Sequence, residues 1–151
     1  MKKFIHYEEA DFNEHLIKIA NQLKSQKFKV DAIVGISRGG LFPAVRLSHA
    51  LNIKMYAHNP GNESALDDWL DENKTTNILI IDEICDSGKT YNDLVQGMGE
   101  FATSPRNYKY AALLYNTDQA FDIDFWGHKF SRKETPEWFQ FFWEKELKWM
   151  N

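Results

Sequence analysis

The sequence has 151 residues, of which 43% are hydrophobic and 15% aromatic, enough for one domain with a sizeable core. Its 18 basic and 22 acidic residues give a net charge of −4, so the chain offers no large cationic field to nucleic acid or to an anionic membrane. No apolar run reaches the roughly 18 residues of a membrane span, and the N-terminus lacks the apolar core of a secretory signal. With a single cysteine, Cys85, we expect a cytoplasmic protein with one domain over residues 1–151.

Hydrophobic periodicity in the first third of the chain predicts a strand, a helix, a strand and a second helix. Residues 4–7 form the first predicted strand, and Asp11 is expected to cap a helix. The apolar side chains of this helix recur every three or four positions, as on one buried face: Phe12, Leu16, Ile19, Ala20 and Leu23. The pattern of residues 30–36 predicts the second strand. The helix after it has four core candidates: Leu41, Val45, Leu47 and Leu51.

The same alternation continues to about residue 126. The predicted elements are a strand over 53–57, a loop over 58–64, a short acidic helix over 65–72, a strand over 78–81, a helix over 89–101, and strands over 110–115 and 121–126. The run Ile78-Leu-Ile-Ile81 is continuously apolar, which is typical of a parallel strand covered on both faces. We therefore predict an α/β fold with a mainly parallel twisted sheet flanked by helices. Ligands of such sheets bind at the carboxyl ends of the strands.

The first informative loop, residues 82–90, follows the strand at 78–81. Two adjacent carboxylates, Asp82 and Glu83, end the strand, and a small polar run then opens a helix. Backbone N–H groups at a helix start, beside Ser and Thr hydroxyls, favour an anion. Carboxylates repel an anion, so they indicate a second ligand type, such as sugar hydroxyls or a divalent cation. The pattern therefore predicts a cradle for ribose 5-phosphate.

Two other interpretations of this loop are an ATP-type phosphate loop and a structural turn. The run Gly88-Lys-Thr90 is shared with the phosphate loop, but that motif needs a glycine five residues before Gly88, where this chain has Glu83. The sequence excludes the first alternative on this point. An acidic loop with a capped helix and no ligand remains the second.

The second informative loop contains Ser37-Arg-Gly-Gly40 and follows the strand at 30–36. A strand-to-helix turn with exposed amides and one guanidinium suits a second anion. A glycine-rich turn with no ligand is the alternative. Because both loops follow strands of one predicted sheet, two anion sites at one edge are the more economical interpretation.

The segment Ile78–Thr90 resembles the signature of type I phosphoribosyltransferases: four apolar residues, two acidic, two apolar, Asp, Thr or Ser, Gly, any residue, Thr. The Ser37-Arg-Gly-Gly40 loop is similar to the pyrophosphate loop of the bacterial xanthine–guanine members. The resemblance implies the type I fold with a small C-terminal or hood region. It also implies a cis peptide between Ser37 and Arg38.

The resemblance assigns roles to both loops. Asp82 and Glu83 would bind the ribose hydroxyls of phosphoribosyl pyrophosphate and, mostly through substrate and water, Mg²⁺. The 5′-phosphate would be bound by Asp86, Ser87, Gly88, Lys89 and Thr90, and the pyrophosphate by Ser37, Arg38, Gly39 and Gly40. Asp86 would be the catalytic residue that handles the proton of the base.

The tail from Trp138 to Glu144 resembles the Trp-x-x-x-Pro-Trp-Asp/Glu tail of the same enzymes, with Phe142 in place of the proline. By this match Trp138 would stack on a purine-type base, Phe139 would offer backbone contacts, and Gln140 would lie near the 2-position. Asn116 stands where the family usually has a lysine that donates to the 6-oxo oxygen. Core or dimer packing is the alternative for most of the six tail aromatics: Trp138, Phe139, Phe141, Phe142, Trp143 and Trp149.

Two functions follow from these motifs. The first is a phosphoribosyltransferase that uses phosphoribosyl pyrophosphate and a purine-type base of the xanthine, guanine or hypoxanthine class. The second is a non-catalytic sensor of the same fold that binds phosphoribosyl pyrophosphate or a nucleotide. Family resemblance also implies a homodimer or homotetramer. The loop around His58 resembles the family's mobile hood, and Cys85 is expected to pack in the core.

Overall fold

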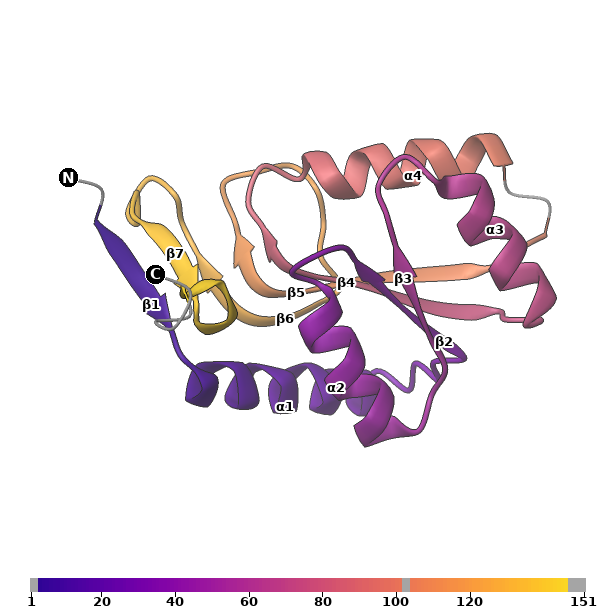
Figure 1. Cartoon of the computed structure of the whole chain (residues 1–151), viewed down its shortest axis with the longest axis horizontal. Coiled ribbons are helices and arrows are strands. Elements are labelled where there is room, and N and C mark those ends of the chain that lie inside the picture. Colours follow the sequence, from indigo (N-terminus) through magenta and orange to yellow (C-terminus); the bar gives the residue numbers. More distant parts are fainter. Residues whose placement is uncertain (1–2, 102–103, 147–151) are drawn as a thin grey trace.

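The computed structural model describes residues 3–101 and 104–146 (Figure 1). Trp149 lies outside the described residues. In chain order the elements are β1 (Phe4–Tyr7), α1 (Glu9–Ser25), β2 (Ala32–Ile36), α2 (Leu41–Leu51), β3 (Met55–His58), α3 (Glu63–Glu72), β4 (Asn77–Cys85), α4 (Lys89–Phe101), β5 (Asn107–Asn116), β6 (Phe125–Phe130), β7 (Trp138–Phe141) and a 3-10 turn (Phe142–Glu144). Among the described residues, no helix is long and apolar enough to cross a membrane.

A five-stranded sheet in the order β3-β2-β4-β5-β6 forms the centre of the molecule, and all its strand pairs are parallel. The predicted α/β fold with a mainly parallel sheet is therefore confirmed. Of the strand bounds, those of β4 and β6 differ most from the sequence prediction. Strand β4 continues through Asp82 and Glu83 to Cys85, because its backbone pairs with β5 along this stretch. Strand β6 covers Phe125–Phe130, later than the predicted 121–126.

The two faces of the sheet carry separate hydrophobic layers. Helices α1 and α2 lie on one face and α3 and α4 on the other (Figure 1). Alternate side chains of a strand point to opposite faces, so Leu79 and Ile81 pack toward α1 and α2 while Ile78 and Ile80 pack toward α3 and α4. All four are at most 1% exposed. Such burial is worth roughly 1.5–3 kcal/mol for each side chain.

Helix α1 begins two residues before the predicted cap. Glu8 is the N-cap residue, and the Asp11 carboxylate lies in the first turn, where its Oδ2 accepts the Glu8 backbone N–H at 2.9 Å. This capping box satisfies backbone donors at the helix start. The predicted inner positions Phe12, Leu16 and Ile19 are buried.

The predicted inner face of α2 is partly wrong. Leu47 is buried, but Val45 and Leu51 are 44% and 38% exposed, and Ala44 takes the inner position instead. The reason is a close approach of α2 to β2. A β-carbon on Gly35 would lie 2.6 Å from the Ala44 β-carbon, so only a small side chain fits there.

Strand β7 had no counterpart in the sequence prediction. It pairs in parallel with β1, the first strand of the chain, with Phe4 opposite Trp138 and Tyr7 opposite Phe141. Figure 1 shows this two-stranded sheet at one end of the molecule, beyond the central sheet. The pairing joins the described ends of the chain into the small C-terminal region that the resemblance implied.

Candidate active site

The carboxylate of Asp82 is buried at the carboxyl end of β4. The side chain is only 8% exposed, and its Oδ1 accepts the backbone N–H of Glu83 at 2.8 Å. Burial, together with the neighbouring Glu83, raises the pKa of Asp82 well above its ordinary value. A carboxyl held in this way is costly to ionise in the free protein. A cation or hydroxyl ligand would favour its charged form.

Glu83 faces the Ser37–Gly40 loop from the same strand. Its Oε2 is buried and has no hydrogen-bond partner among the described residues. A cavity of about 650 Å³ lies here, between Glu83, the Arg38–Gly39 segment and the aromatic pair Phe42 and Trp143. Ligand sites commonly have volumes of about 300–1,000 Å³. The unpartnered oxygen and the cavity together favour a polar ligand.

The loop from Asp86 to Thr90 encloses a smaller hollow of about 160 Å³, which Glu83 also lines. Gly88 has φ +82°, a conformation that favours glycine, and it sits beside Gln119. The Lys89 backbone N–H donates to the Ser87 hydroxyl oxygen at 3.2 Å, where α4 begins. The side chain of Lys89 forms an ion pair with Asp93. Helix-start geometry of this kind suits a phosphate.

The Ser37–Gly40 loop leaves β2 next to β4. Its Ser37–Arg38 peptide is cis, as the resemblance implied. A β-carbon on Gly40 would lie 2.6 Å from the carbonyl oxygens of Ile36 and Ile81, so the loop packs directly on the two strands. Arg38 and Gly39 line the large cavity. The two predicted anion loops therefore lie together, with Glu83 lining both hollows.

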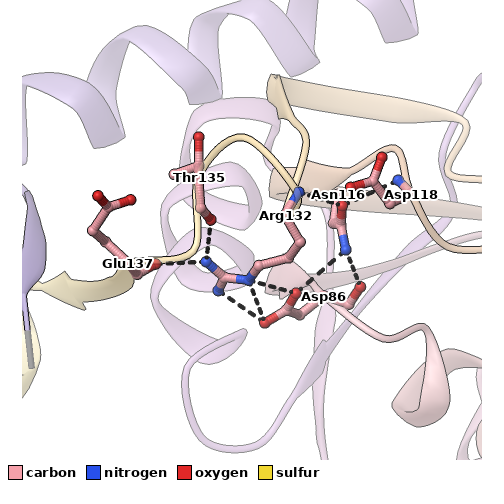
Figure 2. Close-up of polar contacts among 6 residues, drawn as sticks. All are labelled: Asp86, Asn116, Asp118, Arg132, Thr135 and Glu137. Carbon is pink, nitrogen blue, oxygen red and sulfur yellow. Dashed lines mark hydrogen bonds and ion pairs between the residues drawn. The ribbon is translucent and has the colours of Figure 1, made fainter.

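Asp86 lies in a polar network that Figure 2 shows. Arg132 donates from Nε to both Asp86 oxygens, at 3.0 and 3.3 Å, and from Nη2 to Oδ2 at 2.9 Å. Asn116 donates from Nδ2 to the Asp86 carbonyl oxygen at 2.8 Å. Arg132 was not among the site residues predicted from the sequence. No motif marks it, because its partner is 46 residues earlier in the chain.

The aromatic tail divides into a buried part and an exposed part. Phe141 is 3% exposed, and Trp143 stacks on Phe141 and on Phe42 with ring centroids 4.8 and 4.4 Å apart. Trp138 is 55% exposed at the start of β7. Phe139 packs edge-on against Phe130. Core packing therefore accounts for Phe141 and Trp143, whereas more than half of the Trp138 surface is exposed to solvent.

A family model for the phosphoribosyl transferase domain matches residues 7–148. The chain belongs to the phosphoribosyltransferase family. A search of curated protein sequences finds no match. The family assignment agrees with the Ile78–Thr90 signature and with the parallel sheet.

Three solved structures share the fold over nearly the whole chain. A xanthine–guanine–hypoxanthine phosphoribosyltransferase from Helicobacter pylori is 23% identical with a TM-score of 0.79, covering 99% of this chain and 98% of its own. A purine phosphoribosyltransferase from Pyrococcus horikoshii is 22% identical with a TM-score of 0.71, covering 95% and 96%. A hypothetical protein from Neisseria gonorrhoeae with bound ppGpp is 20% identical with a TM-score of 0.70, covering 96% and 91%.

Mg²⁺ fits the donors that this phosphoribosyltransferase offers. Within residues 3–101 and 104–146, no group of three or more His, Cys, Asp or Glu side chains could hold a metal. Asp82 and Glu83 nevertheless offer adjacent carboxylates, one of them with a buried, unpartnered oxygen. Mg²⁺ is commonly held by one or two carboxylates together with substrate phosphates and water. These two residues would suffice for that kind of site.

Two other residues of interest lie close to the site. Burial raises the pKa of the Cys85 thiol to about 12, so the side chain stays protonated, in keeping with its expected place in the core. His58, expected in a mobile hood loop, is instead the last residue of β3 and only 1% exposed. The loop that follows it is short, and α3 begins at Glu63.

Proposed function

We propose that this phosphoribosyltransferase moves the ribose 5-phosphate of phosphoribosyl pyrophosphate onto a purine-type base and releases pyrophosphate. The observation that carries the proposal is the adjacency of the two loops at one edge of the sheet, with Glu83 lining both hollows. One hollow suits a 5′-phosphate and the other a pyrophosphate beside ribose hydroxyls. A single ligand with both phosphate groups would occupy the two together.

Binding of the substrate would use the residues predicted from the sequence. The loop from Asp86 to Thr90 would hold the 5′-phosphate at the start of α4. Asp82 and Glu83 would accept hydrogen bonds from the ribose hydroxyls. The ribose hydroxyls and Mg²⁺ would thereby satisfy the Glu83 oxygen that has no partner in the free protein.

Departure of pyrophosphate from C1′ leaves positive charge on the ribose ring and negative charge on the leaving group. Arg38 and the backbone of Ser37, Gly39 and Gly40 would stabilise the leaving anion. Mg²⁺ bound at Asp82 and Glu83 would neutralise further negative charge. Losing one preorganised donor of this kind typically costs about 10²–10³ in rate.

The base would bind between Asp86 and the β1–β7 sheet. Trp138 would stack on it, with Phe139 and Gln140 along its edge. Asp86 would accept or position the base proton, a contribution of about 10²–10⁴ in rate. Asn116 would act in base binding as a neutral donor, although its amide already donates to Asp86.

An assay of pyrophosphate release tests the proposal. The chain is given phosphoribosyl pyrophosphate, Mg²⁺ and one base at a time: xanthine, guanine, hypoxanthine, adenine, uracil or orotate. We expect turnover with at least one of the oxopurines. Turnover with pyrimidines alone would overturn the purine assignment.

A non-catalytic sensor of phosphoribosyl pyrophosphate or a nucleotide is the second candidate. The observation in its favour is that both Asp86 oxygens are already engaged by Arg132, which reduces their availability to a base. Tight nucleotide binding without turnover of any base would support the sensor. For either function we propose a cytoplasmic location and a homodimer or homotetramer, and the exposed Val45 and Leu51 of α2 are available for such an interface.

A further inference from the structure

Arg132 lies between the loop that would bind ribose 5-phosphate and the strand that carries the aromatic candidates for base binding. One side of its guanidinium contacts the Asp86 carboxylate through Nε and Nη2. On the other side, Nη1 donates to the carbonyl oxygens of Thr135, at 3.0 Å, and Glu137 (Figure 2). Glu137 directly precedes Trp138, the first residue of β7. A single side chain therefore connects the two halves of the proposed site.

The guanidinium suits this connection because its donors are fixed in one plane. Arginine has five N–H donors in a rigid fork, and in this network two nitrogens face Asp86 while the third faces two carbonyl groups. The side chains of Arg132 and Asp86 are 21% and 33% exposed, so solvent competes only partly for the contact. The fork thus fixes the direction in which the Asp86 carboxylate points.

Aromatic rings surround the same guanidinium. Its central carbon lies 5.1 Å from the ring centre of Phe130, 5.6 Å from Phe139 and 5.7 Å from Trp138. A guanidinium within about 6 Å of a ring is attracted to its face. Arg132 is therefore held by cation–π contacts as well as by hydrogen bonds. It also contacts the two rings proposed to flank the base.

Asn116 completes the network from β5. Its Oδ1 accepts the Arg132 backbone N–H at 3.2 Å, while its Nδ2 donates to the Asp86 carbonyl oxygen. Asp86, Arg132 and Asn116 thus form a closed ring of contacts. In this network Arg132 supplies the positive charge near Asp86, and the side chain of Asn116 is neutral.

We propose that Arg132 is a positioning residue for transfer of the ribose 5-phosphate to the base, acting through Asp86 and through β7. This inference rests on the proposed function. Arg132 orients the Asp86 carboxylate so that its remaining lone pairs accept an N–H of the base. It also fixes Trp138 relative to the ribose-phosphate loop. The 5′-phosphate contacts of residues 87–90 do not depend on it.

The test compares Arg132→Gln, Arg132→Lys and the control Lys133→Gln in the full chain. Lys133 is the next residue in the sequence and is exposed. We expect Arg132→Gln to lower kcat by about 10²-fold, the cost of a misplacement near 1 Å, and to raise KM for the base. KM for phosphoribosyl pyrophosphate should stay within about twofold, because the proposed 5′-phosphate contacts of residues 87–90 do not depend on Arg132. A change in kcat with this KM unchanged would separate the two kinds of interaction. The control should match the unaltered chain.

A double-mutant cycle with Asp86→Asn distinguishes positioning from general support of the fold. If Arg132 acts through Asp86, adding Arg132→Gln to Asp86→Asn lowers kcat little further. If the effects of the two substitutions on kcat multiply in the double variant, the inference is overturned. It is also overturned if Arg132→Gln leaves kcat and KM for the base unchanged. Arg132→Lys keeps the charge without the fork and should recover part of the activity. If Arg132→Gln does not fold, Arg132→Lys is compared with the unaltered chain instead. A kcat of Arg132→Lys equal to that of the unaltered chain would refute the role of the fork.

The outcomes also separate this inference from the proposed function. An unaltered chain that turns over no base overturns the proposed function and the positioning role with it. An active chain whose Arg132 variants keep the constants of the unaltered chain overturns the inference alone.

Discussion

The Glu83 carboxylate occupies the place where a side chain on Gly39 would begin. A β-carbon built on Gly39 would lie 1.8 Å from Glu83 Oε2 and 2.2 Å from its carboxyl carbon. The proposed pyrophosphate loop and the proposed ribose-binding strand therefore fit together at this contact. Either the Glu83 side chain or the loop must move if the glycine gains a side chain.

Gly39→Ala should consequently impair substrate binding more than folding. Displacement of Glu83 or of the loop would cost about 10²–10³ in the rate of pyrophosphate release, comparable with losing a preorganised donor. Gly99→Ala in α4 is the matched control. Its new β-carbon meets nothing within 4 Å, and alanine in a helix should stabilise the fold by roughly 0.5–1 kcal/mol. Activity of Gly39→Ala equal to that of the control would contradict the expectation.

Asp82→Asn should stabilise the free protein while removing activity. In the fold the pKa of Asp82 is raised by burial and by Glu83, so the native state binds a proton more readily than the unfolded chain. Stability is therefore lost as the pH rises from the ordinary value of 3.8 through the raised one. The asparagine retains an oxygen for the Glu83 N–H. We expect the free energy of unfolding at pH 7 to rise by about 0.5–2 kcal/mol, measured by denaturant titration.

The loss of activity in the same variant is a separate observable. Asparagine removes the charge proposed to bind Mg²⁺ and ribose hydroxyls, so KM for phosphoribosyl pyrophosphate should rise. A variant that is less stable than the unaltered chain at pH 7 would refute the view that the Asp82 charge is costly in the free protein.

Stability should fall as the pH drops below about 6.5, the ordinary pKa of histidine. Burial lowers the pKa of His58 and of His15 in the fold, so the unfolded chain takes up protons first on acidification. Each such histidine contributes up to about 1.4 kcal/mol per pH unit in this window. His58→Leu should flatten the dependence of unfolding free energy on pH, whereas His49→Leu, at an exposed position, should not. If the free energy of unfolding depends equally steeply on pH in the two variants, His58 is not a source of the acid destabilisation.

Asn116→Lys should destabilise this chain, although the family resemblance implies a lysine at that place. Asn116 is 5% exposed, and its amide contacts Asp86, Asp118 and Arg132. An ammonium there would lose these contacts and repel the guanidinium, at a cost of about 1–3 kcal/mol. Adding Arg132→Gln should recover part of the lost thermal stability. If Asn116→Lys alone is as stable as the unaltered chain, the Arg132 guanidinium does not exclude a second cation at position 116.

Much of the fold could be predicted because its signals are local. The apolar run at Ile78–Ile81 marked a strand buried on both faces, and alternating strand and helix patterns implied a parallel sheet. The boundaries of β4 and β6 were less predictable, since pairing with β5 extends them past the apolar pattern. The inner face of α2 could not be predicted from its own residues either. The close approach of Ala44 to Gly35 decides which face is buried, and Val45 is left exposed.

The family signature and the two loops could be recognised from the sequence alone, because each lies within a few consecutive residues whose types carry the chemistry. Three contacts follow only from the folded chain: Glu83 fills the space beside Gly39, β7 pairs with β1, and Arg132 reaches Asp86. These contacts join residues that are 44, 134 and 46 positions apart, and folding alone brings them together. A guanidinium has no pattern of its own in the sequence. The partner of Arg132 becomes known only when the sheet brings the ends of β4 and β6, with β5 between them, to the same edge.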